Sequence, residues 1–124
     1  MKMIYPEESY AIQGALFEVY RELGAGFLES VYQEALTREF ALRGLPAVSQ
    51  PKLEIHYKGE LLTQHFEADF VCYSKIIIEI KSCKRLDDIH RAQTQNYLRA
   101  TGFQLAILAN FGNSPKLEYE RIVK

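Results

Sequence analysis

The sequence contains few cysteines and no long apolar run. Its two cysteines, Cys72 and Cys83, are too few for a disulfide framework and show no Cys-x-x-Cys spacing. No window approaches the ~18 consecutive apolar residues of a membrane span, and residues 1–6 hold no apolar segment typical of a secretion signal. We therefore expect a protein of the reducing cytoplasm with no membrane partner.

The sequence also lacks a strong net charge. Fifteen Lys and Arg residues face sixteen Asp and Glu residues, so the formal charge is -1 and does not predict a protein that coats nucleic acid through bulk charge. The charges are unevenly spread, because residues 75–100 hold six basic and three acidic side chains. Two interpretations stay open for this stretch, a local basic surface or a solvated face of mixed charge.

The composition predicts one self-sufficient domain. The 124 residues are 48% hydrophobic and include seven Phe and eight Tyr. A chain of this length buries roughly two-thirds of its unfolded surface, so it needs neither disulfides nor metal to fold. No repeat, linker or low-complexity segment interrupts residues 1–124, and we expect a single domain over that range.

Hydrophobic periodicity predicts two helices followed by strands and a third helix. Apolar residues at three- and four-residue steps predict helices over 8–23 and 28–42. Strands are expected after them over residues 53–57, 61–73, 76–81, 103–109 and 117–123. A third helix, which starts at Asp87 or Asp88, is expected over 87–100. The order ααβββαββ favours an α/β or α+β fold with a mixed central sheet flanked by helices.

The predicted strand 61–73 is expected to alternate between two faces. Period two places Phe66, Ala68, Phe70 and Cys72 on one face and Asp69 on the other. Tight turns at 58–59 and 73–75 join this strand to its neighbours on both sides. The apolar run 76–81 is typical of a central strand that is covered on both faces.

Two carboxylates on neighbouring predicted strands are candidate metal ligands. Asp69 and Glu79 each lie near the end of a strand, and the turn at 73–75 sets the strands side by side. Phosphodiester hydrolysis uses Mg²⁺ or a similar cation held by carboxylates. Lys81 shares a face with Glu79, where its ammonium can stabilise phosphate or orient water. The alternative is a cross-strand salt bridge.

Glu29 is a candidate third carboxylate. It borders the apolar stripe of the predicted helix 28–42, three residues before Tyr32. One interpretation gives it a metal shared with Asp69 and Glu79. The other leaves it at the helix N-terminus, where the helix dipole favours a carboxylate.

The predicted third helix carries, along one face, a line of side chains that can form hydrogen bonds. His90, Gln93 and Tyr97 fall at i, i+3 and i+7. Gln93 and Tyr97 can steady phosphate, Lys81 or a water. Alternatively, Tyr97 packs in the core and Gln93 satisfies a backbone group.

These residues carry a family resemblance. The stretch 23–32, with Gly26, Glu29 and Tyr32, resembles the defining motif of the bacterial GxxExxY protein family. That family is similar to the PD-(D/E)xK nuclease superfamily and, within it, to the RecB-type branch with a QxxxY helix. The superfamily motifs are matched in order by Asp69, Glu79-Ile80-Lys81 and Gln93 to Tyr97, within a resemblance that covers residues 5–123. Ala68 departs from the pattern where the superfamily name has proline, at a position that is commonly relaxed.

The resemblance implies a fold and a chemistry. The expected fold is a restriction-endonuclease-like αβββαβ core with an extra N-terminal helix and a C-terminal strand. Mg²⁺ or Mn²⁺ would be held by Asp69, Glu79, Glu29 and the Ile80 carbonyl, and Lys81 would be the catalytic cation, while Gln93 and Tyr97 would support substrate or water. The implied function is metal-dependent cleavage of DNA or RNA. The alternative is a non-catalytic nucleic-acid- or protein-binding module of the same fold.

The expected partner is nucleic acid. Lys84, Arg85, His90 and Arg91 flank the implied metal on the loop and helix that follow the central strand, so we expect them to contact phosphate. A chain of 124 residues leaves little beyond the nuclease core to grip a substrate. A homodimer or a partner subunit would enlarge the binding surface.

Overall fold

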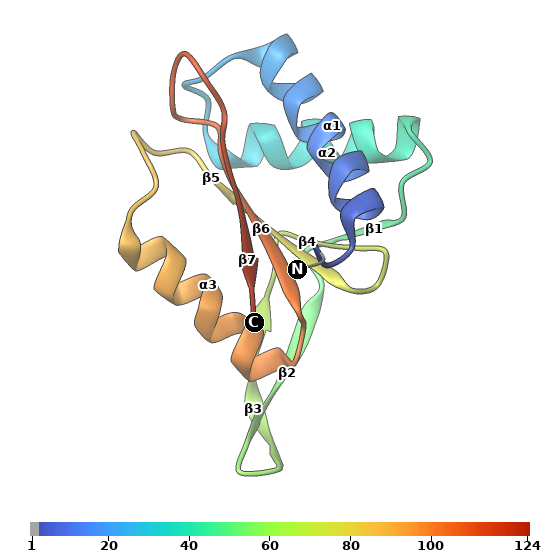
Figure 1. Ribbon diagram of the computed structural model, residues 1–124, viewed down its shortest axis with the longest axis vertical. Helices are drawn as coiled ribbons and strands as arrows, with labels where there is room; N and C mark the ends of the chain where they lie inside the picture. Colours follow the sequence, from blue (N-terminus) through green and yellow to red (C-terminus); the bar gives the residue numbers. More distant parts are fainter. Residues whose placement is uncertain (1–2) are drawn as a thin grey trace.

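The structure, a computed structural model, describes residues 3–124. Figure 1 shows its helices and strands, which follow one another along the chain as α1 (Pro6–Leu23), α2 (Glu29–Leu42), β1 (Ala47–Ser49), β2 (Lys52–Tyr57), β3 (Glu60–Glu67), β4 (Phe70–Cys72), β5 (Ile76–Lys81), α3 (Asp88–Thr101), β6 (Leu105–Asn110) and β7 (Glu118–Val123). Among these residues, none of the helices combines the length and the hydropathy that a bilayer span requires.

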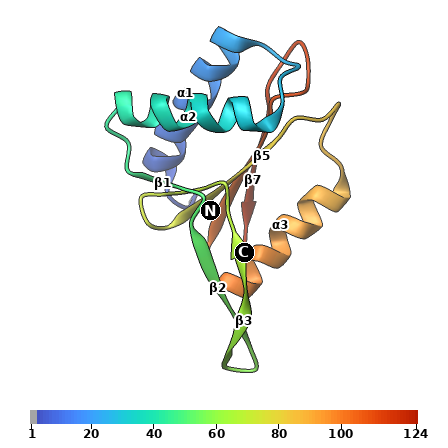
Figure 2. The same cartoon turned by 180° about the vertical axis from the view of Figure 1, so that it is seen from behind.

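A five-stranded mixed sheet forms the centre of the fold. Its strand order is β1-β4-β5-β6-β7, in which β5 and β6 run parallel and the other neighbours run antiparallel. Helices α1 and α2 cover one face, and α3 covers the other (Figures 1 and 2). The predicted mixed sheet flanked by helices is confirmed. The apolar run of β5 lies mid-sheet and is buried on both faces, as its composition predicts.

Local sequence signals set the ends of the helices. Helix α1 begins at Pro6, two residues before the predicted start, because proline is tolerated in the first helical turn. Asp87 caps α3 by accepting a hydrogen bond from the His90 N–H at 3.1 Å. Gly102 ends α3 with a φ of 83°, a left-handed conformation that favours glycine.

The single strand predicted over 61–73 is in fact two strands. Strand β3 pairs with β2 in a separate two-stranded sheet, whereas β4 pairs with β1 and β5 in the main sheet. The β1–β4 pair and the β2–β3 pair form one antiparallel ribbon, in which β2 continues β1 and β4 continues β3. This ribbon bends at Gln50 and Pro51, where it passes from the main sheet to the two-stranded sheet. Gln50 has a φ of 53°, and Pro51 has no N–H to continue the ladder. The short strand β1 was not expected from the sequence.

This bend also corrects the predicted facing of four side chains. Phe66 and Ala68 pack with residues of α3, while Phe70 and Cys72 pack in the core beneath α1 and α2. The expectation that all four share one face is wrong, because strict alternation stops where the ribbon bends at Ala68 and Asp69. The bend turns Asp69 toward the end of the main sheet.

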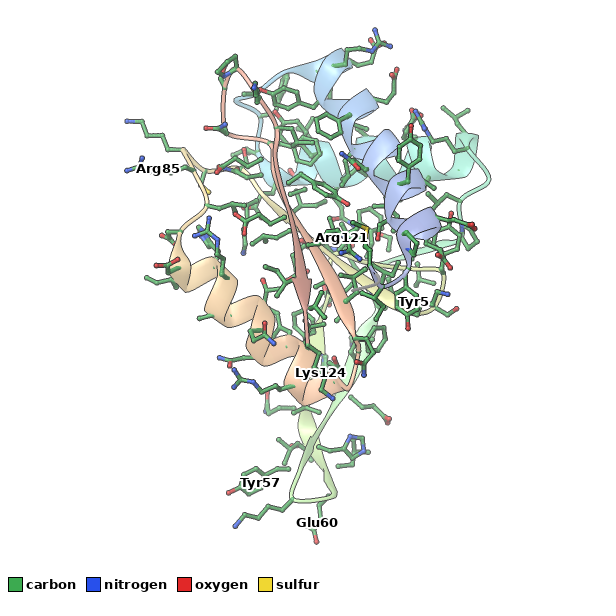
Figure 3. All side chains as sticks on the ribbon, in the orientation of Figure 1. Tyr5, Tyr57, Glu60, Arg85, Arg121 and Lys124 are labelled. Atoms are coloured by element: carbon green, nitrogen blue, oxygen red, sulfur yellow. The ribbon has the colours of Figure 1, made fainter. Side chains whose placement is uncertain are left out.

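The β2–β3 hairpin projects from the body of the molecule (Figures 1 and 2). Its tip is the predicted turn at Lys58 and Gly59, both with positive φ. Figure 3 shows Tyr57 and Glu60 at this tip, far from the sheet centre. The hairpin therefore offers positions for control substitutions that are remote from the site described next.

Candidate functional site

The Asp69 and Glu79 carboxylates meet at the end of the β4–β5 pair. The ladder pairs Phe70 with Ile78, which sets the two acidic residues beside each other just beyond it. The Asp69 N–H donates to Glu79 Oε2 at 3.0 Å, and the Ile80 N–H donates to Asp69 Oδ2 at 2.7 Å. Within residues 3–124, Asp69 Oδ1 and Glu79 Oε1 accept no hydrogen bond. Each carboxylate thus keeps one oxygen for another partner.

Burial and nearby negative charges raise the pKa of both carboxyl groups. Glu79 is 7% exposed, and burial, followed by the nearby Asp69 charge, raises its pKa to about 8. Burial likewise raises the pKa of Asp69, although the Ile80 N–H partly offsets it. The Glu29 charge raises the pKa of both groups, whereas the Lys81 ammonium lowers it. Three carboxylates and one ammonium therefore act on one another at this point.

Glu29 lines a pocket together with two of the other candidate ligands. It is the first residue of α2 and lines a pocket of about 540 Å³ together with Asp69 and Ile80. The remaining walls come from α2 and from residues 49–50. The two interpretations of Glu29 do not conflict, because it occupies the helix N-terminus and also acts on the Asp69–Glu79 pair.

A short loop before α2 fixes the position of Glu29. Gly26 has a φ of 109°, which a residue with a side chain rarely adopts. The buried Tyr32 hydroxyl donates to the Gly24 carbonyl at 2.5 Å and accepts from the Phe27 N–H at 3.2 Å. Gly26 and Tyr32 together fix the conformation of the turn that leads into α2, which begins at Glu29.

The Ile80 carbonyl faces the same edge as the Asp69 carboxylate. In an antiparallel ladder, the N–H and the C=O of one residue point to the same side of the strand. The Ile80 N–H points to Asp69, and the β4 ladder has already ended at Phe70. The carbonyl oxygen therefore lies on an edge of β5 that no strand within residues 3–124 covers at this level.

The available donors have the chemistry that a hard divalent cation requires. Three carboxylates and one carbonyl offer oxygen ligands, which Mg²⁺ and Mn²⁺ prefer. In the part of the chain that the structure describes, no three His, Cys, Asp or Glu side chains are already arranged to hold a metal ion. The Asp69–Glu79 pair nevertheless fits a cation, because a positive charge would offset the burial and the nearby negative charges that raise both pKa values.

Lys81 is the cation that stands beside the acidic pair. It ends β5 two residues after Glu79, on the same face, and it is half-buried. Its Nζ forms no ion pair within 4.0 Å among residues 3–124. A half-buried ammonium without a bound carboxylate is available to an anionic substrate.

Tyr97, on α3, lies within the electrostatic influence of the acidic pair. Its ring stacks on Phe66 with centroids 3.8 Å apart and an angle of 18°. Burial raises the pKa of the Tyr97 hydroxyl, as do the charges of Glu79 and Asp69, while the neighbouring Gln93 acts in the opposite direction. Tyr97 therefore both packs in the core and places its hydroxyl within the field of the carboxylates.

The four predicted phosphate-binding residues divide into two kinds. Lys84 and Arg85 are exposed and form no ion pair within residues 3–124, and Figure 3 shows Arg85 extending from the surface. Arg91 instead binds the Glu120 carboxylate with two hydrogen bonds of 2.8 and 2.7 Å. His90 completes the α3 cap, since its Nδ1 accepts from the Asp87 N–H at 3.2 Å. Two of the four therefore already have structural partners.

Gln33 is a site residue that the sequence interpretation missed. Its Nε2 donates to the Asp69 carbonyl at 3.0 Å and to Ser49 Oγ at 2.9 Å, so it ties α2 to β1 and to the bend between β3 and β4 that carries Asp69. It lies one helical turn after Glu29 and lines the same pocket. The i, i+4 spacing from Glu29 is the signal that could have identified it.

Asn110 was also missed, and it anchors the loop that follows Lys81. This fully buried residue accepts from the N–H groups of Cys83 and Gly112, and it donates to the Cys83 carbonyl and to Glu118. Gly112 packs so closely that a Cβ there would lie 2.3 Å from the Cys83 oxygen. A single polar residue at the end of the apolar run 105–109 was the available signal.

Comparison with known proteins identifies the family. The PD-(D/E)XK nuclease superfamily matches residues 6–122. A search among curated proteins found no significant match. Among solved structures, the crystal structure of SSO0001 is 19% identical and has a TM-score of 0.49, over 99% of this chain and 79% of that one. Because the family match spans almost all of the sequence, the chain belongs to the PD-(D/E)XK nuclease superfamily.

Proposed function

We propose that this protein is a Mg²⁺- or Mn²⁺-dependent nuclease that hydrolyses phosphodiester bonds in DNA or RNA. The observation that carries the proposal is the Asp69–Glu79 pair, with Lys81 beside it and Glu29 in the same pocket as Asp69. We further propose that residues 1–124 form one nuclease domain of the GxxExxY family, in the RecB-like branch. The closed loop between Gly26 and Tyr32 supports this assignment, because it gives each motif residue a physical task.

Asp69, Glu79, Glu29 and the Ile80 carbonyl would hold the divalent cation. When bound, that cation supplies Lewis acidity at the scissile phosphate and favours ionisation of the attacking water. Lys81 stabilises the negative charge that develops on the phosphate oxygens. Gln33 holds the Asp69 backbone in place. Gln93 and Tyr97 steady the substrate or a water from the α3 side.

We expect purified protein to cut nucleic acid in Mg²⁺ or Mn²⁺ and to lose this activity in EDTA. The measurement is a cleavage assay on a panel of single- and double-stranded DNA and RNA. Asp69→Asn is the matched variant, because it keeps the size of the side chain and an acceptor for the Ile80 N–H. Its rate should fall by ~10²-fold or more, on the scale of losing one group that stabilises the transition state.

Four results would count against this proposal. Cleavage that persists in EDTA, or an Asp69→Asn variant as active as wild type, would exclude the assigned site. Binding of nucleic acid without cleavage by wild type would favour the alternative function, a non-catalytic nucleic-acid-binding module with this fold. Binding of neither DNA nor RNA would leave the protein-binding module.

Nucleic-acid binding should depend on Lys84 and Arg85 through their charge. The double variant Lys84→Ala/Arg85→Ala is expected to make the salt dependence of binding shallower by about 0.7–0.9 for each lost phosphate contact. We expect a smaller change for Arg91→Ala, since Arg91 already binds Glu120. Lys58→Ala, at the tip of the projecting hairpin, is the control. An unchanged slope in a folded Lys84/Arg85 variant would place the substrate elsewhere.

The proposed nucleic-acid surface is small. Lys84 and Arg85 are two exposed cations at one side of the site. We therefore propose that a second copy of the chain or a partner subunit extends the surface that grips the substrate.

A further inference from the structure

A second pocket adjoins the proposed active site. It has a volume of about 560 Å³ and shares Glu29 with the pocket that contains Asp69 and Ile80. One wall is formed by residues 26–29, and the opposite wall by residues 82–84 and Gly112. The two pockets lie on either side of Glu29, so a polymer that crosses the site would enter both.

One wall of this second pocket includes a partly exposed aromatic residue. Phe27 is 46% exposed, and its ring meets that of Tyr32 edge-on with centroids 6.1 Å apart. Tyr32 is fully buried and stacks on Phe111 at 4.4 Å. Phe27 therefore packs edge-on against the buried Tyr32–Phe111 stack and leaves part of its surface open. An aromatic ring held in this way is a platform for a nucleic-acid base.

Both walls of the pocket are held in place by hydrogen bonds. The Ser82 hydroxyl donates to the Phe27 carbonyl at 2.5 Å, which joins the loop before α2 to the loop after β5. On the opposite wall, Asn110 binds both the N–H and the C=O of Cys83. The pocket is thus preformed, so a ligand entering it has little ordering cost to overcome.

The charge at the rim suits a phosphate backbone. Lys84 lines the pocket, Arg85 follows it, and both are exposed without an ion pair within residues 3–124. In one pocket, a base would contact the apolar Phe27 and a neighbouring phosphate would contact the Lys84 ammonium. The strand would then continue past Glu29 to the acidic pair.

We propose that this pocket receives an unpaired nucleotide next to the scissile phosphate, with its base stacked on Phe27. This inference rests on the proposed nuclease function and adds a substrate class, a single strand or a frayed end. A base inside a duplex is covered by neighbours on both faces and cannot lie on the ring. Phe27 therefore selects unpaired substrate by a contact that a duplex does not offer.

The test compares the affinities of wild type, Phe27→Ala and Phe27→Tyr for a 2-aminopurine oligonucleotide, presented single-stranded or as a blunt duplex. Binding is followed in EDTA by quenching of the base fluorescence, and cleavage in Mg²⁺ is measured in parallel. Wild type should bind the single strand more tightly than the duplex. Phe27→Ala should weaken single-strand binding by about 5- to 100-fold, the range expected for one lost stacking contact, and should leave duplex binding unchanged. Phe27→Tyr should retain the preference.

Two further variants separate stacking from folding and from general surface effects. Phe27→Leu keeps much of the apolar volume without an aromatic ring, so it should lose single-strand binding even if Phe27→Ala melts at a lower temperature. Tyr10→Ala removes a ring that is 78% exposed on α1, away from the pocket, and should bind like wild type.

The outcomes distinguish this inference from the function on which it rests. If wild type cuts nucleic acid in Mg²⁺ and Phe27→Leu keeps the preference for single strands, the stacking site is wrong and the nuclease proposal stands. An equal loss for single strand and duplex, or a wild-type preference for duplex, would also overturn the stacking site. Wild type that neither binds nor cuts any nucleic acid would overturn both.

Discussion

Replacing Lys81 by alanine is expected to lower metal-dependent cleavage by ~10²- to 10³-fold, the cost of removing one preorganised group that stabilises transition-state charge. The Lys81 ammonium acts on Asp69 and Glu79 yet forms no ion pair within residues 3–124, which leaves it available to phosphate. Because the carboxylates remain, the variant should still bind Mn²⁺. Initial rates of cleavage and Mn²⁺ titration, measured on the same preparation, check both halves of this expectation.

Two substitutions control for the loss of a lysine as such. Lys81→Met removes the charge but keeps most of the half-buried stem, so it should be as inactive as Lys81→Ala. Lys58→Ala removes an exposed lysine at the tip of the β2–β3 hairpin and should cut like wild type. If Lys81→Ala cuts as fast as wild type, the ammonium has no catalytic role.

Replacing Glu79 by glutamine is expected to stabilise the metal-free protein at high pH. Burial and the Asp69 charge raise the pKa of Glu79 from 4.5 to about 8 in the folded protein. The folded state therefore keeps a proton that the unfolded chain releases, so the contribution of Glu79 to stability is full below pH 4.5 and is lost as the pH rises through about 8. The neutral amide avoids this loss and still accepts from the Asp69 N–H. In EDTA at pH 9, Glu79→Gln should melt about 5 °C or more above wild type.

A divalent cation should reverse this order of stability, so that wild type becomes more stable than Glu79→Gln. At a hundredfold excess over its Kd, Mn²⁺ stabilises a protein that binds it by about 2.7 kcal/mol, and Glu79→Gln should gain much less than wild type. Glu60→Gln, at the exposed hairpin tip, should follow wild type in every buffer. A cross-strand salt bridge predicts the opposite pattern, in which Glu79→Gln is less stable in EDTA and neither protein responds to Mn²⁺.

The strong local patterns in the sequence were sufficient to predict most of the elements. The β-branched run 76–80 predicted the buried central strand, and Asp87 and Gly102 predicted the two ends of α3. The meeting of Asp69 with Glu79 also followed from local information, because one tight turn joins their strands. These features depend on residues that are close in sequence, where periodicity and turn chemistry act directly.

The parts that escaped prediction depend on long-range contacts. The bend at Gln50 and Pro51 arises where a ribbon passes from one sheet to another, and alternation within a single strand does not reveal it. Arg91 carries a charge that suggests phosphate binding, but its partner Glu120 lies 29 residues away on β7. The contacts of Asn110 with Cys83 likewise join segments 27 residues apart. Pairings of this kind become visible only once the chain is folded.

The most direct test of the central claim is the anomalous difference density of a crystal soaked in Mn²⁺. The claim is that Asp69, Glu79, Glu29 and the Ile80 carbonyl converge on one divalent cation. The account predicts an anomalous peak bounded by Asp69, Glu79 and the Ile80 carbonyl, with Glu29 reaching it directly or through water. It also predicts that the peak is lost in Asp69→Asn. Mn²⁺ bound elsewhere in the crystal, with none between Asp69 and Glu79, would contradict the account.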